Sequence, residues 1–325
     1  MNITITTYCN LKCPYCFAAD LWKASGSRKC DREISQRNLS KVIKFMKKSG
    51  HGTFRIFGGE PTLHSRFEEV YNTISKNNFS TVIFSNGVIP RQRIEFLKAQ
   101  PNLRQIVVNT QHPSDYRPYQ YEQFKFSLLR LGSLITLGFV VYKTNFDSTF
   151  IVDLIERYGL NRKVKVSIAA PLCGGKNSYI ELKDHKKVIK RLVRQSSVFK
   201  RHGIRWYPDT TFMWCLFTQG QLAELYDNVR FSPINLCTPV LEVAPNLSVY
   251  RCYGAASLSN PKLKITDFGN EKEAFGYFAR KEAPFKTLGV FAKCFRCDMR
   301  GQACGAGCIV HILQSLPKKD YGYIY

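Results

Sequence analysis

The sequence lacks the features that would take it into or across a membrane. No stretch approaches the roughly 18 apolar residues that a membrane-spanning helix needs, and no basic segment followed by an apolar run opens the chain. It also contains no internal repeat and no low-complexity segment. We therefore expect a cytoplasmic globular protein without a membrane partner. Its 325 residues suffice for a barrel-like domain plus a smaller one, at about 150 residues per domain.

Acidic residues are scarce as well. Twenty-four Asp and Glu face 48 Lys and Arg, which gives a formal net charge of +24 at pH 7. Much of the positive charge lies in one helix-like run at 183–201. Such a field attracts a polyanion, either an acidic leader peptide or a nucleic acid, although a solvated helix face is an equally simple explanation. The sequence has no signature of an RNA-binding fold, so charge alone argues for RNA.

Cysteine, in contrast, is abundant, with twelve residues. A reducing cytosol disfavours disulfides, so these thiols indicate metal ligation. Cys9, Cys13 and Cys16 form a C-x3-C-x2-C loop, a spacing that brings three thiolates to one centre. An iron–sulfur cube usually takes four protein thiolates, so three would leave one iron open to a substrate or cofactor. A zinc loop and three buried core cysteines are the alternatives.

A second motif follows a short apolar segment at 53–57. This strand-like run leads directly into Gly58-Gly59-Glu60-Pro61. Two glycines at a strand end let a ligand approach the backbone closely, and Glu60 offers an acceptor to an ammonium group. Alone, the motif is more often an ordinary turn, whereas together with the cysteine loop it is specific.

The two motifs together resemble those of the radical S-adenosylmethionine (SAM) enzymes. The resemblance implies that Cys9, Cys13 and Cys16 hold a 4Fe–4S cluster whose open iron binds the amino and carboxylate groups of SAM. It also implies an enzyme, in which a reductase such as flavodoxin or ferredoxin supplies an electron, SAM is cleaved, and a 5′-deoxyadenosyl radical abstracts hydrogen from a C–H bond. The cofactor-binding residues that it implies near the cluster are Tyr15, Gly58, Gly59, Glu60 and Pro61.

Strand-like and helix-like segments alternate over the first 200 residues. Six β–α units predict an α/β fold with a parallel sheet, which matches the partial (β/α)6 TIM-like barrel that the resemblance implies. Reactive groups collect at the C-terminal strand ends of such sheets. Ser85 and Asn109 end two of the predicted strands and Asn145 follows a third, and all three are further cofactor-binding candidates, with ordinary turn chemistry as the alternative. The predicted strands are 3–7, 54–57, 82–85, 105–109, 134–142 and 164–169, and the predicted helices are 35–48, 67–76, 91–98, 121–131, 150–158 and 182–200.

From about Trp206 the alternation stops and cysteines reappear. Segment 237–252 predicts a β-hairpin turned at Pro245-Asn246 with a cysteine at each end, and a C-x2-C-x6-C-x3-C group follows at 294–308. A zinc ribbon is one explanation. The arrangement also resembles the SPASM extension of radical SAM enzymes, or its shortened, twitch-like form, which carries one or two auxiliary 4Fe–4S clusters. We therefore expect a partial barrel at 1–205 and a small cysteine-rich, SPASM-like auxiliary-cluster domain at 206–325.

The resemblance also assigns ligands to the auxiliary clusters. Those of the first are Cys215, Cys237, Cys252 and Cys308. A second would rest on Cys294, Cys297 and Cys304. Because no cysteine follows Cys308, its fourth position is open, or is filled by His311, or the cluster is absent.

Two cysteines remain, Cys30 and Cys173. Cys173 follows the sixth predicted strand and Cys30 lies in the long loop after the cluster cysteines, so either thiol could serve in catalysis by donating a hydrogen atom to a substrate radical. A buried inert thiol is the alternative for both.

The predicted function is that of a radical SAM/SPASM enzyme that modifies a ribosomally made peptide (RiPP maturation) by a crosslink, an epimerisation or an oxidation. Because the predicted barrel starts at residue 3, we do not expect the usual N-terminal peptide-recognition domain. The alternatives are a nucleic-acid-modifying radical SAM enzyme, a small-molecule radical dehydrogenase, and a non-enzymatic iron–sulfur or zinc protein.

Overall fold

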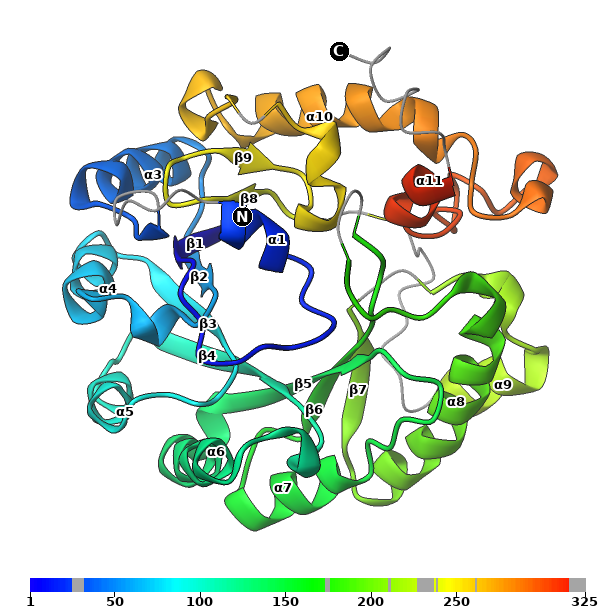
Figure 1. Cartoon of the computed structure of the whole chain (residues 1–325), viewed down its shortest axis with the longest axis horizontal. Coiled ribbons are helices and arrows are strands. Elements are labelled where there is room, and N and C mark those ends of the chain that lie inside the picture. The colour runs from blue at the N-terminus through cyan, green and yellow to red at the C-terminus, as the bar shows by residue number, and fades with distance from the viewer. Residues whose placement is uncertain are drawn as a thin grey trace.

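The computed structural model describes residues 1–24, 32–172, 176–209, 212–226, 237, 239–260 and 262–315. The strands in these ranges are β1 (Asn2–Thr6), β2 (Thr53–Gly58), β3 (Ser80–Ser85), β4 (Leu103–Thr110), β5 (Ile135–Val141), β6 (Lys163–Ile168), β7 (Arg205–Pro208), β8 (Glu242–Val243) and β9 (Val249–Tyr250). The helices are α1 (Ala19–Ala24), α3 (Gln36–Lys48), α4 (Phe67–Lys76), α5 (Arg91–Lys98), α6 (Pro118–Leu131), α7 (Phe150–Tyr158), α8 (His185–Arg201), α9 (Gln219–Tyr226), α10 (Glu271–Lys286) and α11 (Ile309–Ser315). The strands form one sheet in the order β7-β6-β5-β4-β3-β2-β1-β8-β9, which curls into a partial barrel with α3 to α8 around its outer side (Figure 1).

All six predicted β–α units are present, and the strands from β1 to β7 pair in parallel. Helices α4, α5 and α7 begin and end at the residues that the sequence predicts. Apolar periodicity is the reason: α3, for example, buries Leu39, Val42 and Met46 on one face. Its first turn is capped by Ser35, whose hydroxyl accepts a hydrogen bond from the amide of Asn38 at 3.2 Å. The predicted α/β fold with a partial barrel is confirmed.

The sheet extends beyond the six predicted strands. β7 pairs with β6 across the boundary predicted between residues 205 and 206, so the two-domain division stays a prediction. The predicted hairpin is confirmed: β8 and β9 are antiparallel, and Pro245-Asn246 forms the turn between them. β8 also pairs with β1, with Glu242 opposite Asn2. The hairpin therefore covers the edge of the first strand.

The two faces of the sheet differ in burial. On β2 and β3, residues alternate between half-exposed and buried. The buried ones, such as Ile56 and Ile83, belong to the core under the outer helices. The half-exposed ones, such as Arg55 and Phe57, lie on the opposite, inner face of the barrel. Parallel sheets are normally covered on both faces. Here β1 is buried on both, whereas the inner faces of β2 and β3 are partly open to a ligand.

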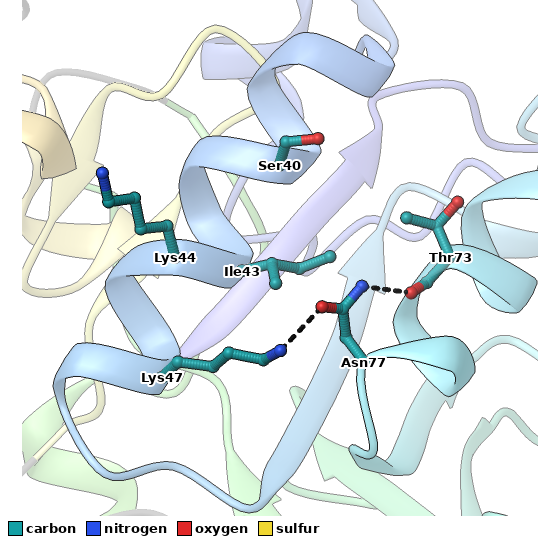
Figure 2. Close-up of a pocket in the computed structure, with 6 residues that line it drawn as sticks. All are labelled: Ser40, Ile43, Lys44, Lys47, Thr73 and Asn77. Atoms are coloured by element: carbon teal, nitrogen blue, oxygen red, sulfur yellow. Dashed lines mark hydrogen bonds between the residues drawn. The ribbon is translucent and has the colours of Figure 1, made fainter.

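The helical outer face carries hollows of its own. One lies between α3 and α4, has a volume of about 320 Å³ and is lined by Ser40, Ile43, Lys44, Lys47, Thr73 and Asn77. Its polar groups already bind one another, because Asn77 accepts from Lys47 Nζ at 2.8 Å and donates to the carbonyl of Thr73 at 2.9 Å (Figure 2). No cysteine lines it, so the chemistry of the chain lies elsewhere. Across the described ranges, no helix combines the length and the apolar character that a bilayer span requires.

Candidate functional site

The predicted cysteine loop follows β1 and leads to α1. Cys9 is exposed, and Cys13 and Cys16 are half-exposed. Two side-chain amides from the neighbouring strand ends donate to the sulfurs. Asn86 Nδ2, after β3, lies 3.6 Å from Cys9 Sγ, and Gln111 Nε2, after β4, lies 3.2 Å from Cys13 Sγ. Such donors stabilise a thiolate, the form that binds metal.

The loop does not favour free thiolates. Cys9 keeps some solvent-accessible surface, but desolvation by the surrounding protein still raises its pKa to about 11, and that of Cys13 to about 12. Glu60 and Cys16 add repulsion at Cys9, and Cys9 and Cys16 add it at Cys13. A cationic metal centre removes this cost of deprotonating the thiols, because its positive charge stabilises the thiolates bound to it. Within the described ranges, no three His, Cys, Asp or Glu side chains converge on a position for a single metal ion. A cubane cluster binds each thiolate through a different iron, so its ligands lie farther apart, and the three cysteines with their amide donors fit such a cluster.

Gly58 and Gly59 lie where β2 meets the cysteine loop. A Cβ atom on Gly58 would lie 2.5 Å from the carbonyl oxygen of Thr6, and one on Gly59 would lie 2.2 Å from that of Tyr8. The Gly59 amide donates to Thr6 O at 2.8 Å and the Glu60 amide to Tyr8 O at 2.7 Å. The sequence predicts a close ligand at these glycines, and the structure shows that the backbone of the cysteine loop itself approaches them closely.

The side chain of Glu60 is fully buried and ties two strand ends together. Its Oε1 accepts from the amide and the hydroxyl of Thr62, and its Oε2 accepts from the Ser85 hydroxyl at 2.9 Å and the Asn86 amide at 2.8 Å. Burial raises the pKa of Glu60, and these hydrogen bonds lower it. A carboxylate has about four acceptor positions. An ammonium group could therefore reach Glu60 only by displacing one of these donors.

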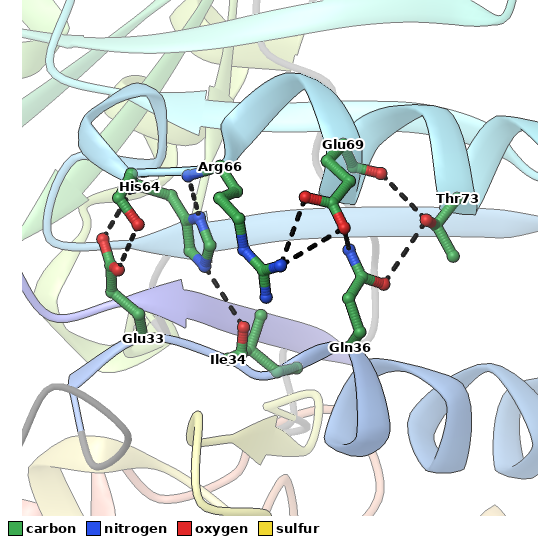
Figure 3. A network of polar contacts seen from close by, with 8 residues as sticks. Glu33, Ile34, Gln36, His64, Arg66, Glu69 and Thr73 are labelled. Carbon is green, nitrogen blue, oxygen red and sulfur yellow. Dashed lines mark hydrogen bonds and ion pairs between the residues drawn. The ribbon is translucent and has the colours of Figure 1, made fainter.

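A second network holds the turn that Pro61 begins. The carboxylate of Glu33 accepts from the amide and the hydroxyl of Ser65 at 2.7 and 2.6 Å. His64 Nε2 lies 3.2 Å from the carbonyl of Ile34, while its Nδ1 accepts from the Arg66 amide at 3.0 Å, so the ring proton is on Nε2 (Figure 3). These contacts fix the end of the Gly-Gly-Glu-Pro motif to the segment that precedes α3.

The structure brings two other predicted residues together. Tyr15 is buried, and its hydroxyl accepts from Asn109 Nδ2, at the end of β4, at 2.9 Å. The Tyr15 ring packs against Tyr142, with centroids 4.9 Å apart. Asn145 instead lies in an exposed turn beyond β5. Cys30 and Cys173 lie outside the described residues.

Sequence reasoning missed the two residues that contact the cysteine sulfurs. Asn86 directly follows Ser85, which the sequence does indicate as a candidate, and Gln111 lies two residues after the candidate Asn109. They share one signal in the sequence, which is their position: Asn86 is the first residue after β3, and Gln111 is the first residue after β4. Asn86 also donates to Asn10 Oδ1 at 2.7 Å, which fixes its amide in the loop.

An aromatic wall lies beside the cysteine loop. Phe17, which follows Cys16, has its ring centroid 6.1 Å from both Phe57 and Tyr253. Phe57 in turn lies 5.7 Å from Phe84. The four rings, Phe17, Phe57, Phe84 and Tyr253, form what we call the inner wall. It joins the loop after Cys16 to the residue after Cys252.

Two cations lie over this wall. Arg55 Cζ is 5.0 Å and Lys165 Nζ is 5.5 Å from the Phe84 centroid. Lys165 is neutralised by Asp209 at 2.7 Å. Within the described ranges, no carboxylate forms an ion pair with Arg55. The inner face therefore presents aromatic surface and positive charge together.

The C-terminal cysteines fall into different surroundings. Cys237, Cys252 and Cys308 interact electrostatically with one another, and burial raises the pKa of all three, that of Cys252 to about 12. Cys252 and Cys308 both pack against a small apolar cluster built on α11. Three of the four residues predicted for the first auxiliary cluster are thus neighbours. The fourth, Cys215, is exposed.

The remaining C-terminal cysteines lie on one irregular segment. Cys294 is buried, Cys297 is exposed and Cys304 is half-exposed. The indole of Trp214, next to Cys215, donates to the carbonyl of Ala303 at 3.0 Å, which joins the segment that contains Cys215 to the one that contains Cys304. His311 is buried on α11, with its ring 5.5 Å from that of His185, and burial lowers its pKa to about 4. This packing is that of an ordinary core histidine.

Comparison with known proteins agrees with the cysteine loop. Residues 3–140 match the family model described as the Radical SAM superfamily. The GTP 3',8-cyclase of Vibrio atlanticus (strain LGP32) is 35% identical over 75 residues, 23% of this chain and 22% of that protein. That of Aquifex aeolicus (strain VF5) is 28% identical over 111 residues, 34% of each chain. The matches thus span about a fifth to a third of the length of these curated relatives.

The fold as a whole is similar to that of a larger solved protein, SuiB of Streptococcus suis. The SuiB structure bound to its precursor peptide SuiA has a TM-score of 0.64 and 14% sequence identity, over 97% of this chain and 72% of that chain. SuiB bound to S-adenosylmethionine gives 0.64 and 16%, over 97% and 73%. At such identities the likeness concerns the fold. The family match thus identifies a radical SAM domain over residues 3–140, and members of that family use a 4Fe–4S cluster and SAM.

Proposed function

We propose that this protein is a radical SAM enzyme that modifies a peptide, and that its C-terminal segment binds an auxiliary iron–sulfur cluster. The observation that carries the proposal is the extent of the fold likeness to SuiB, which includes the segment after β7 as well as the barrel. SuiB was crystallised with a precursor peptide, and a similar fold over 97% of this chain favours a substrate of the same class. We further propose a cytoplasmic location and an electron donor of the flavodoxin or ferredoxin type.

Each part of the site has a task in this proposal. Cys9, Cys13 and Cys16 hold the cluster, which with SAM supplies a radical able to abstract hydrogen from a C–H bond. Gly58 and Gly59 set the position of the cysteine loop. The Asn109 amide holds the Tyr15 ring against the loop, and the inner wall excludes water from one side of it.

The C-terminal segment supplies the auxiliary site. We assign Cys215, Cys237, Cys252 and Cys308 to one auxiliary cluster, with Cys294, Cys297 and Cys304 as the basis of a second with an open fourth position. On this assignment residues 206–325 form a SPASM-like domain beside the barrel at 1–205. The inner wall connects the two sites, because Phe17 and Tyr253 each follow a proposed ligand.

The inner face also favours a particular peptide chemistry. Arg55 presents five N–H donors beside an aromatic surface, with no ion-pair partner among the described residues. A carboxylate on the substrate would meet this guanidinium, and an acidic peptide would be attracted by the net charge of +24. Peptides with acidic residues near the residue to be modified are therefore the first to test as substrates.

A nucleotide substrate is the second candidate, because the curated relatives that match part of the chain are GTP 3',8-cyclases. A peptide substrate and a nucleotide substrate can be distinguished by which of them stimulates formation of 5′-deoxyadenosine. Anaerobically reconstituted protein is given dithionite and SAM, and 5′-deoxyadenosine is measured alone, with acidic peptides, with GTP and with tRNA. A peptide that raises 5′-deoxyadenosine and is itself altered supports the proposal: a crosslink or an oxidation changes its mass, and an epimerisation changes the configuration of a residue. Stimulation by GTP or tRNA alone would overturn the peptide assignment, and the Cys9→Ala/Cys13→Ala/Cys16→Ala variant is the inactive control.

A further inference from the structure

A buried group of charges lies beside the proposed auxiliary ligands. Arg251 is 9% exposed and Glu282 is 3% exposed. Arg251 Nε lies 3.7 Å from Glu282 Oε1, and Lys286 Nζ lies 2.7 Å from Glu282 Oε2. Two cations thus share a single buried carboxylate. Glu271, the other carboxylate that acts on Arg251, is paired with the Met1 amino group at 3.7 Å, so one positive charge remains in excess.

The guanidinium of Arg251 is also incompletely bonded. Its Nη1 is buried and has no hydrogen-bond partner among the described residues, while its Cζ lies 4.5 Å from the centroid of the Phe275 ring. A buried polar group without a partner is costly, and a buried charge more so. Arginine cannot relieve this cost by losing its proton. The arrangement therefore fits an anion that binds next to Arg251.

The cysteines mark where that anion lies. Arg251 directly precedes Cys252 in the chain and interacts electrostatically with Cys252 and Cys237. Lys286 reaches the same place from α10, because its Nζ donates to the carbonyl of Cys237 at 3.3 Å. The excess positive charge thus lies beside two of the three neighbouring thiols.

We propose that Arg251, with Lys286, supplies the countercharge for an anionic iron–sulfur cluster on Cys237, Cys252 and Cys308 and raises its reduction potential. The inference rests on the proposed auxiliary cluster. Thiolate-ligated clusters carry net negative charge, and reduction adds another electron. Nearby positive charge and N–H donors stabilise the reduced form, whereas the carboxylate of Glu282 opposes it. Arg251 and Glu282 should therefore act on the potential in opposite directions.

The test compares Arg251→Gln with Glu282→Gln in the full-length, anaerobically reconstituted chain. Midpoint potentials are measured by redox titration followed by electron paramagnetic resonance, and the signals are assigned with the same changes in the Cys9→Ala/Cys13→Ala/Cys16→Ala background. We expect a more negative auxiliary potential in Arg251→Gln and a more positive one in Glu282→Gln. The radical SAM cluster should keep its potential in both. Arg280→Gln, which removes an exposed charge from the same helix, should shift neither cluster.

Iron content separates the two levels of the proposal. Wild-type protein with only about four irons per chain would show that the auxiliary cluster does not exist, and the inference would fail with it. Auxiliary iron with unchanged potentials, or with both variants shifted the same way, would overturn the inference and leave the auxiliary cluster in place. If Arg251→Gln loses its auxiliary iron, the auxiliary potential of Glu282→Gln alone tests the inference. This variant should keep its cluster, because a glutamine has the shape of the buried carboxylate.

Discussion

At the scale of single residues, the role of a residue depends more on how closely the backbone approaches it, or on whether its charge is buried, than on its type. Gly59 is required by the carbonyl of Tyr8 and not by an unusual backbone conformation, since its φ is not positive. Glu242 is buried in β8, where its Oε2 has no partner in the described structure and neither has Oδ1 of the facing Asn2. Gly59 thus controls the position of the cysteine loop, and Glu242, which the sequence analysis does not single out, controls the edge of β1.

Gly59→Ala should displace the cysteine loop. The added methyl would lie 2.2 Å from the Tyr8 oxygen, so either the loop or β2 has to move. We expect a loss of about 1–3 kcal/mol in the free energy of unfolding, as for other overpacked sites, and a loss of most iron from the radical SAM site. Gly52→Ala is the matched control, because nothing lies within 4 Å of its Cβ position. Equal iron content in the two variants would contradict the role assigned to Gly59.

Glu242→Gln should change how stability depends on pH. Burial raises the pKa of Glu242 from 4.5 to about 7, although the Asn2 amide, which donates at 2.9 Å, and Arg55 lower it. The folded protein therefore binds this proton more tightly than the unfolded chain. The wild type should lose about 3 kcal/mol of stability as pH rises from about 4.5 through 7, and the glutamine variant should not.

Anaerobic urea unfolding at pH 5.5 and pH 8 measures this difference. The variant should gain on the wild type at both pH values, by about 2 kcal/mol more at pH 8 than at pH 5.5. A glutamine NH2 would in addition supply the donor that Asn2 Oδ1 lacks. Glu122→Gln, at a side chain that is 72% exposed, should behave the same at both pH values. A pH-independent difference for Glu242→Gln would show that this carboxyl group ionises at its ordinary pH.

At the scale of elements, buried hydrogen bonds hold the turn after β2, whereas the ion pair at the start of the next helix, α4, is exposed. Glu33, 6% exposed, receives two hydrogen bonds from Ser65. In the same network the ion pair of Arg66 and Glu69 is about half exposed, at 3.4 Å (Figure 3). Exposed ion pairs contribute little, whereas buried hydrogen bonds to a charged group contribute more.

Glu33→Gln should therefore destabilise the protein far more than Glu69→Gln. An amide at position 33 accepts at one oxygen only, so either the amide or the hydroxyl of Ser65 loses its acceptor. We expect a loss of about 2–3 kcal/mol for Glu33→Gln and at most about 0.5 kcal/mol for Glu69→Gln. Urea unfolding of both variants under one set of conditions measures the two values, and equal losses would refute the distinction.

At the scale of the whole molecule, the sequence predicts the alternation of strands and helices well, because helices such as α4 and α7 have clear apolar periodicity. It predicts less well what depends on packing between distant segments. β7 has four residues, too few for a periodic signal, and its strand identity comes from pairing with β6. The contacts of Asn86 and Gln111 with sulfur arise only when the sheet brings the ends of β3 and β4 close to the loop that follows β1. The excess charge around Arg251 has no signal in sequence at all.

Iron content tests the proposal for the whole chain. Only seven cysteines lie beyond residue 205, one short of the eight that two fully thiolate-ligated cubes need. About eight irons per chain would support one auxiliary cluster, and about twelve would support a second on Cys294, Cys297 and Cys304 with a fourth ligand other than cysteine. About four would rule out both. Replacing Cys252 with alanine should remove about four irons while those of the radical SAM site remain.

The pairing of β1 with β8 has a consequence for the order in which the protein matures. Asn2 and Glu242 are partners across 240 residues, so one edge of β1 has no strand beside it until the hairpin has left the ribosome. Contacts so distant in sequence form late, and an open strand edge invites wrong pairing in the meantime. The cysteine loop is attached to the end of this strand. Loading of its cluster should therefore follow synthesis of nearly the whole chain, and a nascent chain stalled before residue 242 should take up no iron at Cys9, Cys13 and Cys16.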